Sequence, residues 1–273
     1  MSIKHNQFHE LSNCQNLYFC GKYLFMALIH SFEKSGNWLF RHRGELPVVL
    51  FILAIPVVYL TDLSWLTPTT NAMLTWVSIA ISIKGFLIRS YSIGTTPKGT
   101  SGRNTKAGQI AESLNVTGIY SMLRHPLYVG NFLMWIGIVL FTFNFSFVII
   151  VSLAFWLYYE RIMFAEERFL ERKFGQAYLD WSLTTPAFLP SYRNYTPSIV
   201  PFSLKSVLRR EYSGMMATVT GFTFVALLRH WFQYGSINWL SMPVYVFAAA
   251  LFITIVLRTL KHSTNVLKEK DRS

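Results

Sequence analysis

Residues 126–159 read PLYVGNFLMWIGIVLFTFNFSFVIIVSLAFWLYY and contain no charged side chain. About 20 apolar residues are needed for a helix to cross a bilayer. Only Asn144 separates the apolar runs 126–143 and 145–159. Pro126 suits the first turn of a helix, where its missing N–H costs nothing. The stretch therefore predicts two membrane spans that form a tight helical hairpin.

Four further apolar segments predict spans at residues 46–61, 72–88, 214–228 and 242–257. Lysine and arginine gather in alternate loops, whereas the loops around Asp62, Asn144 and Asn238 are short and nearly uncharged. By the positive-inside rule, this pattern predicts an all-α polytopic protein of about six transmembrane helices with both termini in the cytoplasm. In a bacterium this would be a protein of the cell inner membrane.

The composition supports a membrane protein rather than a soluble one. Hydrophobic residues make up 52% of the chain and charged residues only 14%, whereas a soluble domain has about 25% charged residues. The net charge of +12 is explained by the loop positions of the basic residues, and no basic-aromatic groove or DNA-reading helix points to nucleic acid.

The organisation divides the chain into three parts. Residues 1–45 form a cytoplasmic or interfacial segment, with an interfacial helix over 17–29, because that apolar run is short and Lys22 interrupts it. Residues 46–195 form the core, with a flexible loop over 92–113 and an amphipathic cytoplasmic helix over 160–181, after the fourth span. Residues 196–273 add a transmembrane hairpin and a basic tail.

Two clusters of polar residues bracket the central hairpin. Arg124 and His125 precede it directly, and the adjacent carboxylates Glu166 and Glu167 follow it within Arg161-Ile-Met-Phe-Ala-Glu166-Glu167-Arg168. Each cluster has a plainer interpretation, as interface anchors or as a solvated helix with i,i+4 pairs. A tight hairpin, however, brings its entrance and exit together, which predicts that the clusters converge at one cytoplasmic site.

The motif Gly118-Ile-Tyr…Arg124-His125-Pro126-Leu-Tyr128-Val-Gly130, followed by the hairpin and by Glu166-Glu167-Arg-Phe-Leu170, is specific in its order and spacing. Phe174-Gly175, Tyr178, Thr185-Pro186 and Leu189-Pro190 continue it. Over about residues 80–190 the chain resembles the isoprenylcysteine carboxyl methyltransferases, a family related to the membrane phospholipid methyltransferases. The regions before and after this part match nothing in that family.

The resemblance implies S-adenosylmethionine as the cofactor and a methyltransferase that acts on a lipid or lipidated acceptor from the bilayer. The paired glutamates would hold the cofactor's ribose hydroxyls or amino group, since carboxylates accept strong hydrogen bonds from both. By resemblance, the further cofactor-binding residues would be His125, Pro126, Tyr128 and Gly130, and the catalytic residues Arg124, Arg161 and Glu167.

An anionic acceptor oxygen is already nucleophilic, so the enzyme mainly has to align the partners and exclude water. This fits the absence of a Ser-His-Asp or metal-ligand pattern in the sequence. The resemblance suggests that Arg161 or Arg168 orients the acceptor, since arginine positions an anion through paired donors. Arg103, in a loop with Lys98, would suit a phosphorylated head group, with lipid A phosphate as one candidate.

Two other functions stay open. A phospholipid head-group N-methyltransferase would share the scaffold and the cofactor. A non-catalytic transporter or binding protein would use ionisable residues inside its spans, whereas here most charges lie at the water boundary. Oligomeric state and acceptor identity do not follow from the sequence.

Overall fold

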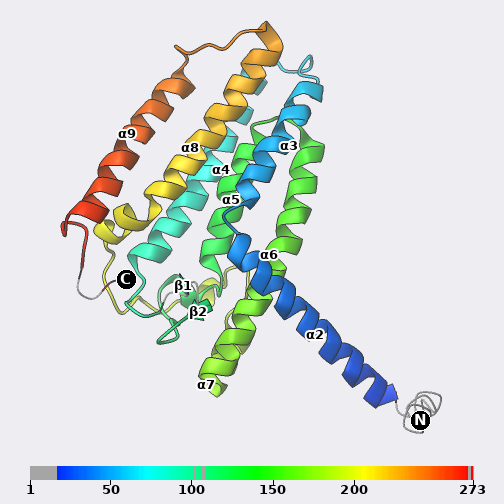
Figure 1. Ribbon diagram of the computed structural model, residues 1–273, viewed down its shortest axis with the longest axis vertical. Helices are drawn as coiled ribbons and strands as arrows, with labels where there is room; N and C mark the ends of the chain where they lie inside the picture. The colour runs from blue at the N-terminus through cyan, green and yellow to red at the C-terminus, as the bar shows by residue number, and fades with distance from the viewer. Residues whose placement is uncertain (1–16, 101–102, 106–107, 270–271, 273) are drawn as a thin grey trace, which may run out of the picture.

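Long helices dominate the computed structural model, which describes residues 17–100, 103–105, 108–269 and 272 (Figure 1). The all-α prediction is confirmed, with one small addition. Within the loop expected to be flexible, strands β1 and β2 pair antiparallel, with Asn104 opposite Gln109. The elements are α2 (Leu17–His42), α3 (Leu46–Leu60), α4 (Pro68–Gly94), β1 (Arg103–Thr105), β2 (Gly108–Ile110), η1 (Ile119–Ser121), α5 (Pro126–Leu140), α6 (Phe145–Phe174), α7 (Gln176–Thr184), η2 (Tyr192–Asn194), α8 (Leu204–Tyr234) and α9 (Met242–Ser263).

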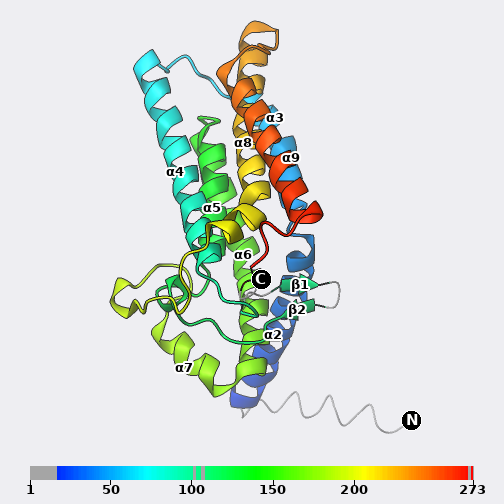
Figure 2. The same cartoon turned by 90° about the vertical axis from the view of Figure 1, so that its left-hand side faces the viewer.

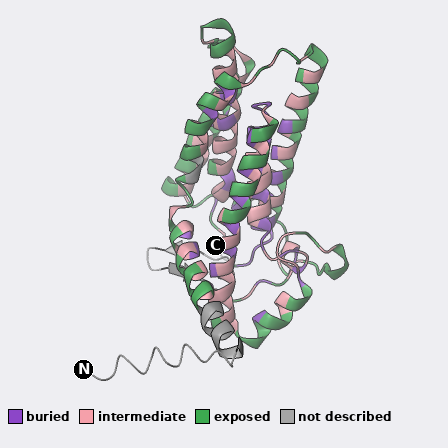
Figure 3. Ribbon diagram, turned by 90° about the vertical axis from the view of Figure 1, so that its right-hand side faces the viewer, coloured by how far each residue is buried: buried purple, intermediate pink, exposed green. Residues whose placement is uncertain are grey.

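The chain is an integral membrane protein. Among the described residues, 3 helices are long and apolar enough to cross a bilayer, namely α4, α6 and α9, and α3 and α5 are shorter apolar helices. Large apolar side chains face outward, such as Ile52, Leu153 and Phe252, which are 61–68% exposed. Figure 3 shows this exposed surface along the outer helices. The count of six spans stays a prediction, since α3 and α5 are short and α8 is not among the helices that are long and apolar enough.

The central hairpin forms as predicted. Helix α5 ends at Leu140 and α6 begins at Phe145. The Asn144 side chain caps α6 by accepting a hydrogen bond from the Phe147 N–H at 2.9 Å. Helix α5 lies inside the bundle, against α4 (Figure 2).

Helices α4 and α5 approach closely because small residues line their contact. An added Cβ at Gly85 would lie 2.5 Å from the Gly130 carbonyl oxygen, and one at Gly137 would lie 2.2 Å from Ser82 Oγ. The Ser82 hydroxyl donates to the Met134 carbonyl across the contact at 2.8 Å. Small residues and such hydrogen bonds are typical of helix packing in membranes.

The region after the fourth span differs from the prediction in detail. No separate amphipathic helix follows the span, because nothing breaks the helix between Tyr159 and Phe174, and α6 continues through to Phe174. Gly175, with φ 54°, then ends α6, and the short helix α7 follows. The polar part of α6 is therefore a direct continuation of its membrane part within one helix.

The N-terminal helix is longer than the interfacial helix expected over 17–29. Helix α2 runs to His42 and packs across α6, where Gly36 lies against the Arg161 carbonyl and the Arg172 guanidinium pairs with Glu33 at 2.6 Å. Residues 1–16, part of the predicted N-terminal segment, lie outside the described residues.

A buried ion pair connects α4 to α8. Arg89 donates from Nη2 to Glu211 Oε1 at 2.6 Å and from Nε to Oε2 at 2.8 Å. The Glu211 side chain is only 2% exposed. The two parallel hydrogen bonds of this pair offset the free-energy cost of burying both charges.

We expect Glu211→Gln to destabilise the protein by about 3 kcal/mol or more, because Arg89 would keep a buried charge without its counterion. Thermal unfolding of purified protein in neutral detergent measures this. Glu171→Gln is the matched control, because its pair with Arg168 lies in side chains 34–35% exposed and should contribute at most about 1 kcal/mol. The double variant Arg89→Met/Glu211→Met should recover part of the loss. Equal unfolding temperatures for Glu211→Gln and the intact protein would contradict this role.

Candidate active site

The segment that leads into α5 is held by the segment that follows α7. The Arg124 backbone N–H donates to the Pro186 carbonyl at 2.9 Å, and the His125 N–H donates to the Ala187 carbonyl at 3.3 Å. Pro126 then begins α5. The motif residues before the hairpin and the Thr185-Pro186 residues after it therefore lie side by side.

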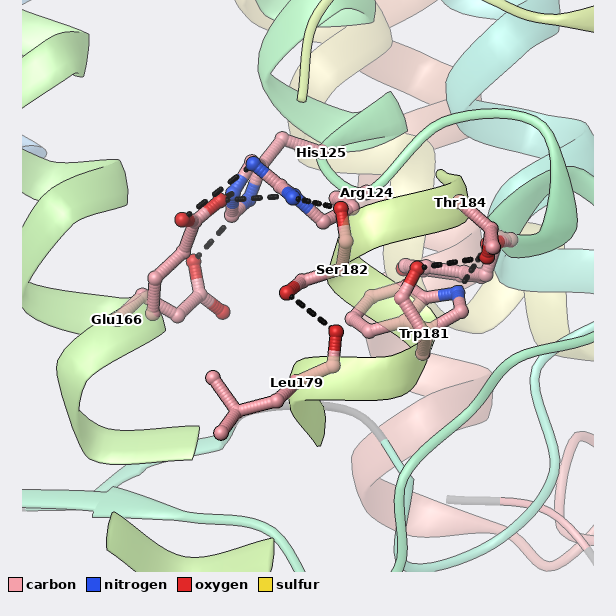
Figure 4. A network of polar contacts seen from close by, with 9 residues as sticks. Arg124, His125, Glu166, Leu179, Trp181, Ser182 and Thr184 are labelled. Carbon is pink, nitrogen blue, oxygen red and sulfur yellow. Dashed lines mark hydrogen bonds and ion pairs between the residues drawn. The ribbon is translucent and has the colours of Figure 1, made fainter. Parts of the chain in front are cut away.

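The two polar clusters converge as the hairpin predicts. His125 Nε2 lies 2.8 Å from Glu167 Oε1, and Arg124 Nε lies 3.0 Å from the same oxygen. Tyr128 donates its hydroxyl to Glu166 Oε2 at 2.8 Å. Figure 4 shows Arg124 and His125 beside Glu166 of α6. The start of α5 is thus joined to the extension of α6 by charged contacts.

Helix α7 closes one side of this network. The Arg124 guanidinium donates from Nη1 to the Ser182 carbonyl at 2.7 Å, and the Trp181 indole donates to the Tyr120 carbonyl at 3.1 Å. The Tyr178 side chain is buried, 3% exposed. With contacts from two directions, Arg124 is fixed relative to Glu167.

Two phenols near the network are held in their neutral form. Burial, together with the nearby Glu166 carboxylate, raises the pKa of the Tyr120 phenol to about 12. Burial and the neighbouring Glu167 carboxylate also raise the pKa of the Tyr178 phenol. Near neutral pH both side chains therefore stay protonated and can act as hydrogen-bond donors.

A polar cavity of about 530 Å³ lies beside the network. Its walls come from the C-terminal end of α2 and from α4, η1, α5, α6 and α8, so residues far apart in the sequence meet around it. The lining includes Phe40, Arg43, Arg89, Tyr120, Arg124, His125, Pro126, Tyr128, Asn131, Tyr159, Glu166, Arg210, Glu211 and Ser213.

One wall carries residues that sequence reasoning missed. The Arg89 guanidinium donates from Nη1 to Asn131 Oδ1 at 2.6 Å, and the Asn131 amide donates to the Tyr159 hydroxyl at 3.1 Å. Together with Glu211, these side chains form a chain of polar contacts from α8 to α6. The sequence contains no clear signal for Arg89, because a basic residue directly after the apolar run 72–88 is what the positive-inside rule expects.

Three other predicted site residues lie away from the cavity lining. The Arg161 guanidinium lies 3.3 Å above the Phe32 ring, facing α2. Arg168 pairs with Glu171 at 2.6 Å. Gly130 lies against Arg89 Cγ and the Gly85 carbonyl, as a packing residue between α5 and α4. Arg103 has its backbone in β1, but its side chain is outside the described part of the chain. Roles for these four residues stay predictions.

A second cavity, of about 520 Å³, lies between α4, α8 and α9 and is lined mainly by apolar side chains such as Ile79, Phe86, Val219 and Val246. An apolar lining of this kind suits a hydrocarbon chain. The charged groups needed to hold a polar cofactor line the first cavity instead.

Comparison with known proteins gives the family. The family model described as phospholipid methyltransferase matches residues 72–177. The nickel-cobalt-cadmium resistance protein NccN of Alcaligenes xylosoxydans xylosoxydans is 38% identical over 159 residues, which cover 56% of this chain and 67% of that protein. The cobalt-zinc-cadmium resistance protein CzcN of Cupriavidus metallidurans is 33% identical over 165 residues, 58% of this chain and 68% of that protein.

An enzyme is also among the relatives. A protein-S-isoprenylcysteine O-methyltransferase of Schizosaccharomyces pombe is 33% identical over 73 residues, which cover 27% of this chain and 31% of that protein. No solved structure matches the chain. The motifs around the polar cavity fall within or close to the region matched by the family model. The chain therefore belongs to the phospholipid methyltransferase and isoprenylcysteine carboxyl methyltransferase family of integral membrane methyltransferases.

Proposed function

We propose that this protein transfers a methyl group from S-adenosylmethionine to an anionic oxygen of a lipid or lipidated acceptor. The observation that carries the proposal is the convergence of Arg124, His125, Tyr128 and Glu166 on one wall of the polar cavity. Loop charge supports a cytoplasmic position for this cavity and for both termini.

The residues present fit the cofactor. Glu166 lines the cavity with a carboxylate oriented by the Tyr128 hydroxyl, and such a carboxylate can accept hydrogen bonds from an amino group or from ribose hydroxyls. When bound, S-adenosylmethionine supplies a methyl group on a positively charged sulfur, so transfer forms one oxygen–carbon bond while the sulfur–carbon bond breaks and its electron pair stays on sulfur.

The protein's own residues would act by positioning. Glu167 bonds His125 and pairs with Arg124, so these side chains keep fixed orientations along the cavity wall. No proton has to leave an anionic oxygen, so a strong base is not required. Alignment of the two partners and exclusion of water would supply most of the rate enhancement.

A head-group N-methyltransferase is the nearest alternative. An amine acceptor must lose a proton before it reacts, and its charged form would be repelled by the arginines of the cavity. Mass spectrometry of membrane lipids after expression distinguishes the two, since fragmentation places the added methyl on a phosphate or carboxylate oxygen or on nitrogen.

We expect the purified protein in neutral detergent to bind S-adenosylmethionine and Glu166→Gln to bind it at least about tenfold more weakly, since a charge-assisted hydrogen bond contributes about 1.5–3 kcal/mol. Isothermal titration calorimetry measures both. Glu171→Gln, on the same helix but paired with Arg168 away from the cavity lining, should bind like the intact protein. Absence of binding by the intact protein would overturn the cofactor assignment.

The names of two relatives suggest a biological setting. NccN and CzcN are named as metal resistance proteins. In the part of the chain that the structure describes, no group of three or more His, Cys, Asp or Glu side chains could hold a metal ion, so we do not propose direct metal binding. Methylation of an anionic lipid oxygen removes a negative charge from the membrane surface, which would weaken its attraction for divalent cations.

If this setting is correct, expression of the protein in a sensitive bacterial host should raise tolerance to cadmium, and Glu166→Gln should abolish the gain because it impairs methyl transfer. Growth across a cadmium concentration series measures this, with immunoblotting to match protein levels. Equal tolerance conferred by the intact protein and by Glu166→Gln would separate any resistance from catalysis.

A further inference from the structure

The charge balance around the polar cavity points to the acceptor. Four arginines line it, whereas its carboxylates are Glu166 and Glu211, with Glu167 just behind the wall. The cavity therefore has a positive excess even before a cationic sulfonium is bound. Opposite charges in a site of reduced dielectric attract strongly, and like charges repel as strongly, so a negatively charged second ligand would restore the balance.

The four arginines differ in their contacts. Arg89 is paired with Glu211 and Arg124 with Glu167, and Arg210 also has an interaction partner. Arg43 stacks over the Phe40 ring at 4.3 Å. Among the described residues, the ion pairs include none between Arg43 and a carboxylate. Arg43 is thus the cavity arginine whose charge is best placed to meet a ligand.

Arg43 also lies at a suitable boundary. It stands just after α2 ends at His42 and just before α3 begins at Leu46. Helix α3 carries no charged residue and exposes Val48, Val49 and Ile52, which are 49–61% exposed. Such a junction of a charged turn with an apolar helix is expected at the membrane surface, where lipid head groups lie.

We propose that Arg43 binds the anionic head group of a lipid acceptor whose hydrocarbon part remains in the bilayer. This inference rests on the proposed function and deepens it, by assigning the acceptor's charge and a residue that selects for it. Arginine suits the role because its guanidinium offers paired donors to a phosphate or carboxylate. Methylation would cancel the acceptor's charge, weaken its contact with Arg43 and so favour release of the product.

A plainer role for Arg43 is an interface anchor that fixes the end of α2. An anchor would contribute to stability and topology but would not discriminate between head groups. Binding selectivity therefore separates the two roles, and it can be measured without cofactor or turnover.

The test uses the full chain in neutral detergent, titrated by microscale thermophoresis with dioctanoyl phosphatidic acid and, separately, with dioctanoyl phosphatidylcholine. We expect the intact protein to prefer the anionic lipid, and Arg43→Gln to weaken its binding about tenfold while binding of the zwitterionic lipid changes little. Arg41→Gln is the matched control, because Arg41 lies two residues earlier in the last turn of α2, is exposed like Arg43, and does not line the cavity. Inorganic phosphate should compete weakly, because it lacks the hydrocarbon part.

Equal affinity of Arg43→Gln and the intact protein for phosphatidic acid would overturn the assignment, as would an equal loss in Arg41→Gln. Effective competition by inorganic phosphate would overturn the lipid part of it. Should Arg43→Gln fold poorly, Arg43→Lys replaces it: lysine keeps the charge of an interface anchor but lacks the paired donors, so it should still weaken binding of phosphatidic acid, and unchanged affinity would overturn the assignment. Titration with S-adenosylmethionine is separate: its failure alone would refute the proposed cofactor and leave the head-group site standing.

Discussion

The contact of Glu167 with His125 and Arg124 is the interaction on which the site depends. It joins the segment that leads into α5 to the extension of α6 at distances of 2.8 and 3.0 Å. A carboxylate that is partly buried needs such partners, because burial without them is costly. Removing the contact would leave the Arg124 and His125 side chains without their shared carboxylate partner, so they would lose their fixed orientation along the cavity wall.

The sequence predicted that the two clusters converge, but it predicted neither the contact of Glu167 with His125 and Arg124 nor the whole cavity. A hairpin with a short connection must bring its ends together, so the convergence of Arg124 and His125 with the glutamates followed from chain geometry alone. Helix periodicity also places Tyr159 and Glu166, seven residues apart, on one face, and both line the cavity. The opposite wall could not be predicted, because Arg89 and Glu211 are 122 residues apart and only the packing of α8 on α4 brings them together.

Periodicity also explains where the predicted acceptor arginines lie. Arg161 is six residues before Glu167 on α6, and at 3.6 residues per turn it points to a different side of the helix. That side is covered by α2, where Arg161 meets Phe32. Motif resemblance assigns residues by order along the chain, whereas access to the cavity is decided by the direction of each side chain. The prediction over 160–181 likewise missed that α6 would continue without a break, although no glycine or proline interrupts it before Gly175.

The segments before and after the region matched by the family model also contribute residues to the cavity wall. The region matched by the family model, residues 72–177, supplies the motif wall, but Arg43 precedes it and Arg210 and Glu211 follow it. A family core that supplies only the motif wall can therefore serve different acceptors if the flanking segments determine the charge of the remaining walls. In this chain those flanking segments contribute Arg43, Arg210 and one carboxylate, Glu211, and that carboxylate is neutralised by Arg89. The net contribution of the flanking segments is positive, which is the physical reason to expect a negatively charged acceptor here.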